Sequence, residues 1–216
     1  MNFKAVLFDL DGTLLDTLRD VADATNQALL QMGFPTHPTE EYKMLVGEGR
    51  EALAYKALPE NKRDPSTVNR LISLINFEYD KRWSLHTRPY EGIPVLLDGL
   101  SLRNIKMAVL SNKAQKYVEI TVARLLPYWR FEVIIGAQPS LPLKPDPYAA
   151  LLIARKLSIV PSCFLYLGDS GIDMRTAVNA GMYPVGALWG FRTAEELISA
   201  GAWKLISTPP ELLEIL

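Results

Sequence analysis

The amino-acid sequence predicts an α/β fold, in which a doubly wound, Rossmann-like parallel sheet carries an inserted helical segment. Short runs of Val, Ile, Leu, Phe and Tyr recur along the chain, and they are continuous rather than alternating, which is typical of strands covered on both faces. The runs span residues 4–10, 105–111, 131–137, 163–169 and 184–190. Helix-like stretches separate the later runs, and strand alternating with helix is the pattern of a parallel sheet.

The helices between the later strands have recognisable ends. Asp146 is suited to be a helix N-cap with Pro147 at the first helical position, and Thr193 with Glu196 has the spacing of a capping box. Gly181 follows a helical stretch and is a typical helix stop. On these signals we expect helices over residues 114–126, 146–157, 172–181 and 193–201.

A helical segment interrupts the alternation after the first strand. Apolar residues follow helical spacing over residues 14–33, and two further helical stretches cover about 40–58 and 65–83. After the first strand no further strand signal appears before residue 105. The sequence therefore predicts a helical domain over residues 16–88, inserted into a core domain made of 1–15 and 89–216.

Composition narrows the class of protein. The chain has 216 residues, 49% of them hydrophobic, and 23 basic against 24 acidic side chains with no basic block, so no nucleic-acid partner is expected. The single cysteine, Cys163, excludes an intramolecular disulfide. No secretory signal and no apolar run of bilayer length is visible, so we expect no membrane partner and a cytoplasmic monomer or homodimer.

Polar residues stand where the predicted strands end. In an open parallel sheet the ligand site lies beyond the carboxyl ends of the strands. Asp9 and Asp11, Ser111 and Asp169 follow three of the strands, and Lys144 lies in the loop after another. Carboxylates are ligands that Mg²⁺ prefers, whereas a lysine and a hydroxyl suit a phosphate group.

Simpler interpretations of the same residues stay open. Asp11 followed by Gly12 is also a strong turn signal for a β-hairpin, although the helical spacing that follows argues against a returning strand. Ser111 and Asp169 are suitable helix caps, and Lys144 is suited to be a solvated loop lysine.

Four segments in order resemble the motifs of the haloacid dehalogenase superfamily. They read DLDGTLLDT at 9–17, LSNK at 110–113, KPDP at 144–147 and GDSGIDM at 168–174. The resemblance extends over the whole chain and is nearest to the phosphatase branch, including phosphoglycolate phosphatases, because the dehalogenase branch lacks an acid at the position of Asp11. The helical insertion resembles the cap domain of that family.

The resemblance implies a role for each motif residue. Asp9 is the expected nucleophile that becomes an aspartyl phosphate, and Asp11 the expected general acid and then base. Mg²⁺ is the expected cofactor, held by Asp9, the backbone carbonyl of Asp11 and Asp169. The resemblance places Gly12, Ser111, Asn112 and Lys144 at the phosphate, and Thr13 and Asp173 behind the metal site.

Substrate choice is expected to lie in the inserted helices. The stretch VGEGRE at 46–51 resembles the substrate-specificity loop of the family, and Gly47, Gly49 and Arg50 are its candidate contacts. The simpler interpretation is that the glycines break a helix and that Arg50 is solvated.

The expected substrate is a small phosphorylated metabolite, 2-phosphoglycolate first of all. Two alternatives compete with this interpretation. One is a phosphotransferase similar to β-phosphoglucomutase, and the other is a non-catalytic phospho-acceptor receiver module, which also places Asp, hydroxyl and Lys groups at strand ends.

Overall fold

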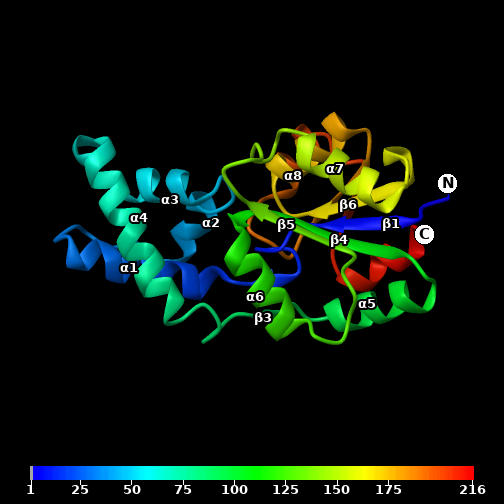
Figure 1. Cartoon of the computed structure of the whole chain (residues 1–216), viewed down its shortest axis with the longest axis horizontal. Helices are drawn as coiled ribbons and strands as arrows, with labels where there is room; N and C mark the ends of the chain where they lie inside the picture. The colour runs from blue at the N-terminus through cyan, green and yellow to red at the C-terminus, as the bar shows by residue number, and fades with distance from the viewer. Residues whose placement is uncertain (1) are drawn as a thin grey trace.

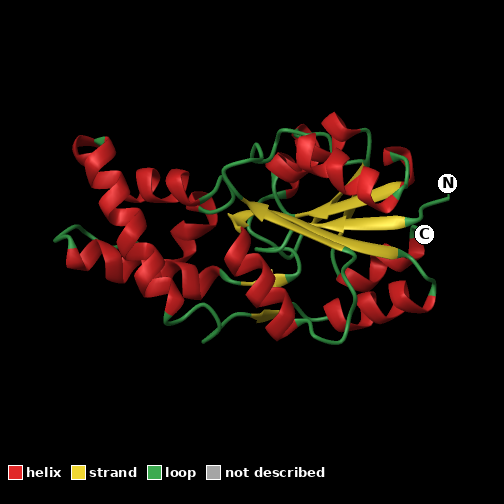
Figure 2. Cartoon of the chain, viewed as in Figure 1, coloured by secondary structure: helices red, strands yellow, loops and turns green. Residues whose placement is uncertain are grey.

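The computed structural model describes residues 2–216 and contains a six-stranded parallel sheet (Figures 1 and 2). The strands are β1 (Ala5–Phe8), β4 (Lys106–Ala114), β5 (Val133–Ala137), β6 (Phe164–Gly168), β7 (Tyr183–Ala187) and β8 (Lys204–Ile206). Their order is β5-β4-β1-β6-β7-β8, and all neighbours are parallel. The predicted doubly wound sheet is confirmed, and its order reverses between β1 and β6, where such sheets bind ligands.

Helices cover both faces of the sheet. Helices α5 (Ile93–Leu102) and α6 (Gln115–Leu125) lie on one face with the 3₁₀ segment η4 (Pro209–Glu214), and α7 (Tyr148–Leu157) and α8 (Gly171–Ala180) lie on the other (Figure 1). The short elements η3 (Pro161–Cys163) and α9 (Ala194–Ser199) complete this part. Along β1, Val6 and Phe8 face α5 and α6, whereas Ala5 and Leu7 face α7 and α8, and all four are fully buried. Burial on both sides explains why the strand is a continuous apolar run.

The remaining helices form a separate unit at one end of the molecule (Figure 1). It contains α1 (Leu18–Gln31), α2 (Tyr42–Leu45), α3 (Arg50–Ala57) and α4 (Pro65–Asp80), with the 3₁₀ turns η1 (Thr39–Glu41) and η2 (Glu60–Lys62). We call these elements the helical unit. Leu29 of α1, Ala57 of α3 and Leu71 of α4 pack in an apolar cluster of its own. Among residues 2–216, no helix is both long and apolar enough to cross a membrane.

Two short strands connect the helical unit to the sheet. Strand β2 (Leu15–Asp16) leads out and pairs antiparallel with the returning β3 (Arg88–Pro89). Beside this pair the buried carboxylate of Asp20 accepts hydrogen bonds from the backbone N–H of His86 and from both the N–H and the hydroxyl of Thr87, at 2.7–3.1 Å. The outgoing and returning chains are therefore held together at one place.

The helix expected from residue 14 begins only at Leu18, so this part of the prediction is wrong. The carbonyl of Leu10 accepts hydrogen bonds from the N–H groups of Thr13, Leu14 and Leu15, which makes a tight turn before β2. Leu14 and Leu15 are both fully buried in the core of the sheet. The hairpin alternative is also wrong, because β1 pairs in parallel with β4 and β6.

The helix expected over 40–58 is interrupted at residues 46–49, between α2 and α3. Gly47 and Gly49 have φ angles of +121° and +92°, which favour glycine and end the helical path. Strand β4 continues past its expected end at Ser111, and β8 was not predicted because three residues give no periodic signal.

The expected start of the helix after the KPDP segment is also wrong. Helix α7 begins at Tyr148 rather than at Pro147, and Asp146 accepts a hydrogen bond from the Tyr148 N–H at 2.8 Å. By contrast, Gly181 ends α8 in the left-handed conformation, as predicted.

Candidate active site

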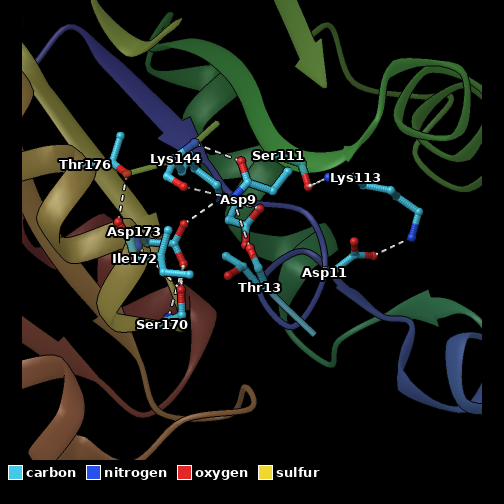
Figure 3. Close-up of polar contacts among 12 residues, drawn as sticks. Asp9, Asp11, Thr13, Ser111, Lys113, Lys144, Ser170, Ile172, Asp173 and Thr176 are labelled. Atoms are coloured by element: carbon cyan, nitrogen blue, oxygen red, sulfur yellow. Dashed lines mark hydrogen bonds and ion pairs between the residues drawn. The ribbon is translucent and has the colours of Figure 1, made fainter. Parts of the chain in front are cut away.

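Three carboxylates converge at the carboxyl ends of β1 and β6 (Figure 3). Asp9 follows β1, Asp169 follows β6, and Asp173 lies in the first turn of α8. All three are buried, and each offers an oxygen within 4.8 Å of the others. They meet because β1 and β6 are parallel neighbours, so the residues that follow them leave the sheet side by side.

Lys144 is the ammonium group inside this cluster. Its Nζ lies 2.9 Å from Oδ1 of Asp9 and 2.7 Å from Oδ1 of Asp173. Burial disfavours the charged form, but Asp173 and Asp9 outweigh it and raise the pKa of Lys144 well above its ordinary value. The lysine is therefore a buried cation, and its interpretation as a solvated loop residue is wrong.

Asn112 holds the loop that carries Lys144. Its Oδ1 accepts a hydrogen bond from the Lys144 N–H at 2.9 Å, and its Nδ2 donates to the Lys144 carbonyl at 3.1 Å. Nδ2 also donates to the carbonyl of Gly47 in the helical unit at 3.0 Å. The side-chain amide of Asn112, which was expected to contact the phosphate, is thus already hydrogen-bonded to the backbone at Lys144 and at Gly47.

Burial and mutual repulsion act on the carboxylates. Burial, with the charges of Asp173 and Asp169, raises the pKa of Asp9 well above its ordinary value, and Lys144 only partly opposes this. Burial and Asp173 raise the pKa of Asp169 to about 7. Asp169 is held by the Thr13 hydroxyl on Oδ1 at 3.0 Å and by the Phe191 N–H on Oδ2 at 2.7 Å.

Asp173 is already fully engaged. Its Oδ1 accepts from Lys144, and its Oδ2 accepts from the Ser170 N–H at 3.1 Å and the Ser170 hydroxyl at 2.6 Å. Ser170 is the N-cap of α8 and forms a capping box with Asp173, so the alternative that Asp169 caps this helix is wrong. Asp173 therefore anchors Lys144 and the helix, while Asp9 and Asp169 face the site.

Asp11 points away from the three carboxylates (Figure 3). Its Oδ1 lies 2.7 Å from Nζ of Lys113, and both side chains are largely buried. Gly12 makes the intervening turn possible: its φ is +85°, and a Cβ atom there would lie 2.4 Å from Oδ2 of Asp169. The turn thus brings Asp9 and Asp11 to different sides of one site.

Residues Ser111 to Lys113 lie in an irregular part of β4. The pairing of β4 with β5 shifts register between Leu110 and Ala114, and such bulges redirect side chains near active sites. Ser111 is buried, and its Oγ accepts a hydrogen bond from the Lys113 N–H at 3.2 Å. Ser111, Asn112 and Lys113 all line the same cleft as Asp9, and Lys113 reaches Asp11 there.

A cleft of about 630 Å³, including space open to solvent, lies between these residues and the helical unit. Gly47, Gly49 and Arg50 line it, so all three candidate contacts of the helical unit face the site. The guanidinium of Arg50 lies 5.6 Å from the ring centre of Tyr79 and 4.8 Å from that of Tyr117. Arg50 is therefore stacked on two aromatic rings rather than free in solvent.

The sequence profile of the haloacid dehalogenase-like hydrolase family matches residues 6–187. The chain belongs to this family. The chain is 31% identical to a phosphoglycolate phosphatase of Nitrosospira multiformis, over 90% of its own length and 87% of the relative. The N-acetylmuramic acid 6-phosphate phosphatase of Pseudomonas aeruginosa is 30% identical, with 100% and 96% covered.

Solved structures agree with the family assignment. A crystal structure of a provisionally assigned phosphoglycolate phosphatase from Lactobacillus delbrueckii subsp. bulgaricus superposes with a TM-score of 0.93. The two chains are 29% identical, and the match covers 100% of this chain and 98% of the other. The chain is a phosphatase of the haloacid dehalogenase type. The family match sets aside the receiver-module alternative.

Two side chains of this phosphatase site were missed by the sequence analysis. Lys113 ends the LSNK motif, and its position two residues after Ser111 was a usable signal, since side chains at i and i+2 of a strand share a face. Tyr79 of α4 lines the cleft, and its apolar periodicity within a helix resembles that of any core residue. No local signal distinguished it.

Proposed function

We propose that this protein is a Mg²⁺-dependent phosphomonoesterase that acts through an aspartyl phosphate, with 2-phosphoglycolate as its substrate. The observation that carries the proposal is that two different sets of side chains lie around Asp9. One side of Asp9 faces Lys144 and Asp169, which suit a metal ion and a phosphoryl group, and Asp11 stands apart, where a leaving group can be protonated.

The charges of the cluster fit a divalent cation. In their ionised forms Asp9, Asp169 and Asp173 would bring three negative charges against the single ammonium of Lys144 and leave two unbalanced in a buried place, which is why the pKa values of Asp9 and Asp169 are raised without a metal. Since Asp173 is fully engaged by Lys144 and Ser170, Asp9, Asp169 and the backbone carbonyl of Asp11 would hold the ion. Mg²⁺ bound there would neutralise charge on the phosphoryl oxygens.

Asp9 and Asp11 carry out the two chemical steps, which are the formation and the hydrolysis of the aspartyl phosphate. A carboxylate oxygen of Asp9 attacks phosphorus, the bond to the ester oxygen breaks, and Asp11 gives its proton to the departing alkoxide. Water then attacks the aspartyl phosphate while Asp11 takes a proton from it, which releases phosphate and restores Asp9. The Ser111 hydroxyl and the Lys144 ammonium hold the phosphoryl oxygens throughout, and Gly12 lets the backbone approach them.

The cleft favours an anionic substrate. Arg50, Lys113 and Lys144 are cationic, whereas Asp9, Asp11 and the adjoining Asp169 and Asp173 are anionic when ionised, so the site has a net charge of +1 once a divalent cation is bound. A phosphate monoester that also carries a carboxylate has about three negative charges. The similarity to phosphoglycolate phosphatases supports 2-phosphoglycolate, the smallest substrate of this kind.

A second candidate substrate comes from the relatives. N-acetylmuramic acid 6-phosphate is named for the Pseudomonas aeruginosa relative, which the chain matches over its whole length. This compound also combines a phosphate ester with a carboxylate, but the two groups lie far apart on a sugar. Both candidate substrates therefore need a second site that binds an anion, but the distance of that site from the phosphate differs between them.

The helical unit acts as a cap over this cleft, with domain boundaries at residues 16–88 in a core of 1–15 and 89–216. The antiparallel pairing of Asp16 with Arg88 supports these boundaries. The cap loop at residues 46–49 is fastened to the core by Asn112 on the Gly47 carbonyl and by Arg192, whose Nη2 donates to the Val46 carbonyl at 3.0 Å. Closure of such a unit excludes water and positions the leaving group.

Phosphate release in the presence of Mg²⁺ tests this proposal. We expect the highest kcat/KM with 2-phosphoglycolate, compared with N-acetylmuramic acid 6-phosphate, β-glucose 1-phosphate and ethyl phosphate. Transfer of phosphate from β-glucose 1-phosphate to another sugar hydroxyl, with no release into water, would instead support the mutase alternative. Absence of hydrolysis of every carboxylated ester would refute the proposed substrate class.

A further inference from the structure

Lys113 is a buried cation at the inner end of the cleft. Its side chain is only 5% exposed, and among residues 2–216 its carboxylate partner is Asp11, at 2.7 Å. Burial alone would favour the neutral amine, but the charge of Asp11 outweighs it and raises the pKa of Lys113 above its ordinary value. Lys113 therefore keeps its positive charge next to the group that protonates the leaving alcohol.

Tyr79 offers an unused hydrogen-bond donor in the same place. The residue is 2% exposed, it comes from α4 of the helical unit, and its hydroxyl has no hydrogen-bond partner among the described residues. Its ring centre lies 4.9 Å from Nζ of Lys113. Burial raises the pKa of Tyr79, so the hydroxyl stays protonated and is able to donate. A buried hydroxyl without a partner is unfavourable unless a ligand supplies one.

We propose that Lys113 and Tyr79 form the site that binds the carboxylate of the substrate, and that this carboxylate takes the place of Asp11 on Lys113. The inference rests on the proposed function and names the residues that select its substrate. In 2-phosphoglycolate a single carbon separates the leaving oxygen from the carboxylate. When Asp11 faces the leaving oxygen, the carboxylate must therefore lie within reach of the cation that Asp11 contacts, which is Lys113.

The exchange of partners gives the site its selectivity. A substrate carboxylate that engages Lys113 frees the Asp11 side chain to reach the leaving oxygen. An ester without an anion near its phosphate leaves Asp11 held by Lys113. A carboxylate farther from the phosphate would instead meet Arg50, whose guanidinium lies over the rings of Tyr79 and Tyr117.

The test compares 2-phosphoglycolate with ethyl phosphate, which has the same chain length and no carboxylate. The measured quantity is the ratio of the two kcat/KM values for the Mg²⁺-loaded protein. Lys113→Met should reduce this ratio by about 10- to 150-fold, the effect of losing a charged hydrogen bond, and Tyr79→Phe by roughly 2- to 13-fold, as for a neutral one. Lys113→Arg should recover part of the ratio because it restores the charge.

Lys116→Met is the matched control. Lys116 lies three residues farther along, is 63% exposed and pairs with Asp80 at the surface, so this substitution should change the ratio by less than about twofold. Equal losses for 2-phosphoglycolate and ethyl phosphate in Lys113→Met would mean that Lys113 only positions Asp11, and would overturn the carboxylate site. If thermal melting shows that Lys113→Met is not folded, Tyr79→Phe takes its place, and equal losses for the two esters in that variant would likewise overturn the carboxylate site.

A binding measurement separates this inference from the proposed function. 3-Phosphonopropionate, the uncleavable counterpart of 2-phosphoglycolate, should bind more tightly than propylphosphonate, and calorimetry should show that Lys113→Met removes most of that preference. A protein that shows this preference but does not hydrolyse 2-phosphoglycolate would refute the proposed reaction and retain the anion site. An unchanged preference in both Lys113→Met and Tyr79→Phe would overturn the site and leave the reaction intact.

Discussion

The ammonium of Lys144 lies 2.9 Å from Oδ1 of Asp9, and both groups are buried between β1 and the loop that follows β5. This ion pair holds the proposed nucleophile in a fixed position before any substrate arrives. Asp173 also pairs with Lys144, at 2.7 Å, and Asn112 forms hydrogen bonds with both the N–H and the carbonyl of its backbone.

Asp9→Asn should remove turnover and preserve the fold, because an amide is not a nucleophile and binds Mg²⁺ poorly. Burial raises the pKa of Asp9, so the carboxylate is held at a cost in stability, and the variant should melt at or above the wild-type temperature at pH 8 in chelator. Phosphate release and thermal melting are measured together. Asp146→Asn, an exposed carboxylate of the KPDP segment, is the control. About a tenth of the wild-type rate remaining in Asp9→Asn would contradict its role.

Asp11→Asn should slow both formation and hydrolysis of the aspartyl phosphate, by roughly 10²-fold or more for each step in which proton transfer matters. An aryl phosphate has a good leaving group and needs little protonation. The first step should therefore suffer less with 4-nitrophenyl phosphate than with ethyl phosphate, as rapid-quench measurements would show. An equal slowing of that step for both esters would argue against general-acid catalysis by Asp11.

Metal binding and stability should depend on pH in opposite directions. The pKa of Asp169 is raised to about 7, so between its ordinary value near 4 and pH 7 the native state holds more protons than the unfolded state. The free energy of unfolding of the metal-free protein should therefore fall as pH rises through this range. Mg²⁺ needs the deprotonated carboxylates, so its stabilising effect should be larger at pH 8 than at pH 5.5.

Thermal melting in chelator and in Mg²⁺ across pH 5–8 checks both trends. Asp169→Asn should lose part of the pH-dependent decline and most of the Mg²⁺ effect. Phosphate release should require Mg²⁺, and Ca²⁺ should inhibit it, because Ca²⁺ accepts more oxygens at longer distances and can hold both oxygens of Asp9. Full activity in excess chelator would refute the metal assignment, and the same pH slope in Asp169→Asn as in the wild type would contradict the raised pKa of Asp169.

Arg50→Ala should weaken catalysis less than the loss of Lys113. The guanidinium lies over Tyr79 and Tyr117, and the loss of these cation–π contacts removes about 0.5–2 kcal/mol of the packing that positions Tyr79, so kcat/KM for 2-phosphoglycolate should fall by no more than roughly 2- to 30-fold. Glu51→Ala, an exposed neighbour in α3, is the control. A larger loss in Arg50→Ala than in Lys113→Met, confined to carboxylated esters, would move the anion site to Arg50.

Most of the sheet and the order of the site motifs could be predicted from local sequence. The strands that are buried on both faces are continuous apolar runs, so β1 and β6 were visible without any tertiary information, and the parallel order placed Asp9 and Asp169 at one edge. Gly181 ended its helix as predicted. These features depend on propensity and periodicity, which a short stretch of chain carries by itself.

What the tertiary structure decided is which polar atoms meet. Asp11 pairs with Lys113, which is 102 residues away in the sequence. The side-chain amide of Asn112 donates hydrogen bonds to the backbone carbonyls of Lys144 and of Gly47 in the helical unit. The helical unit begins at Leu18 rather than at Leu14 because the core of the sheet buries Leu14 and Leu15. Periodicity records only whether a residue is apolar, whereas the partner of a charge or an amide depends on distances between segments that are remote in sequence, and only the packed fold fixes those distances.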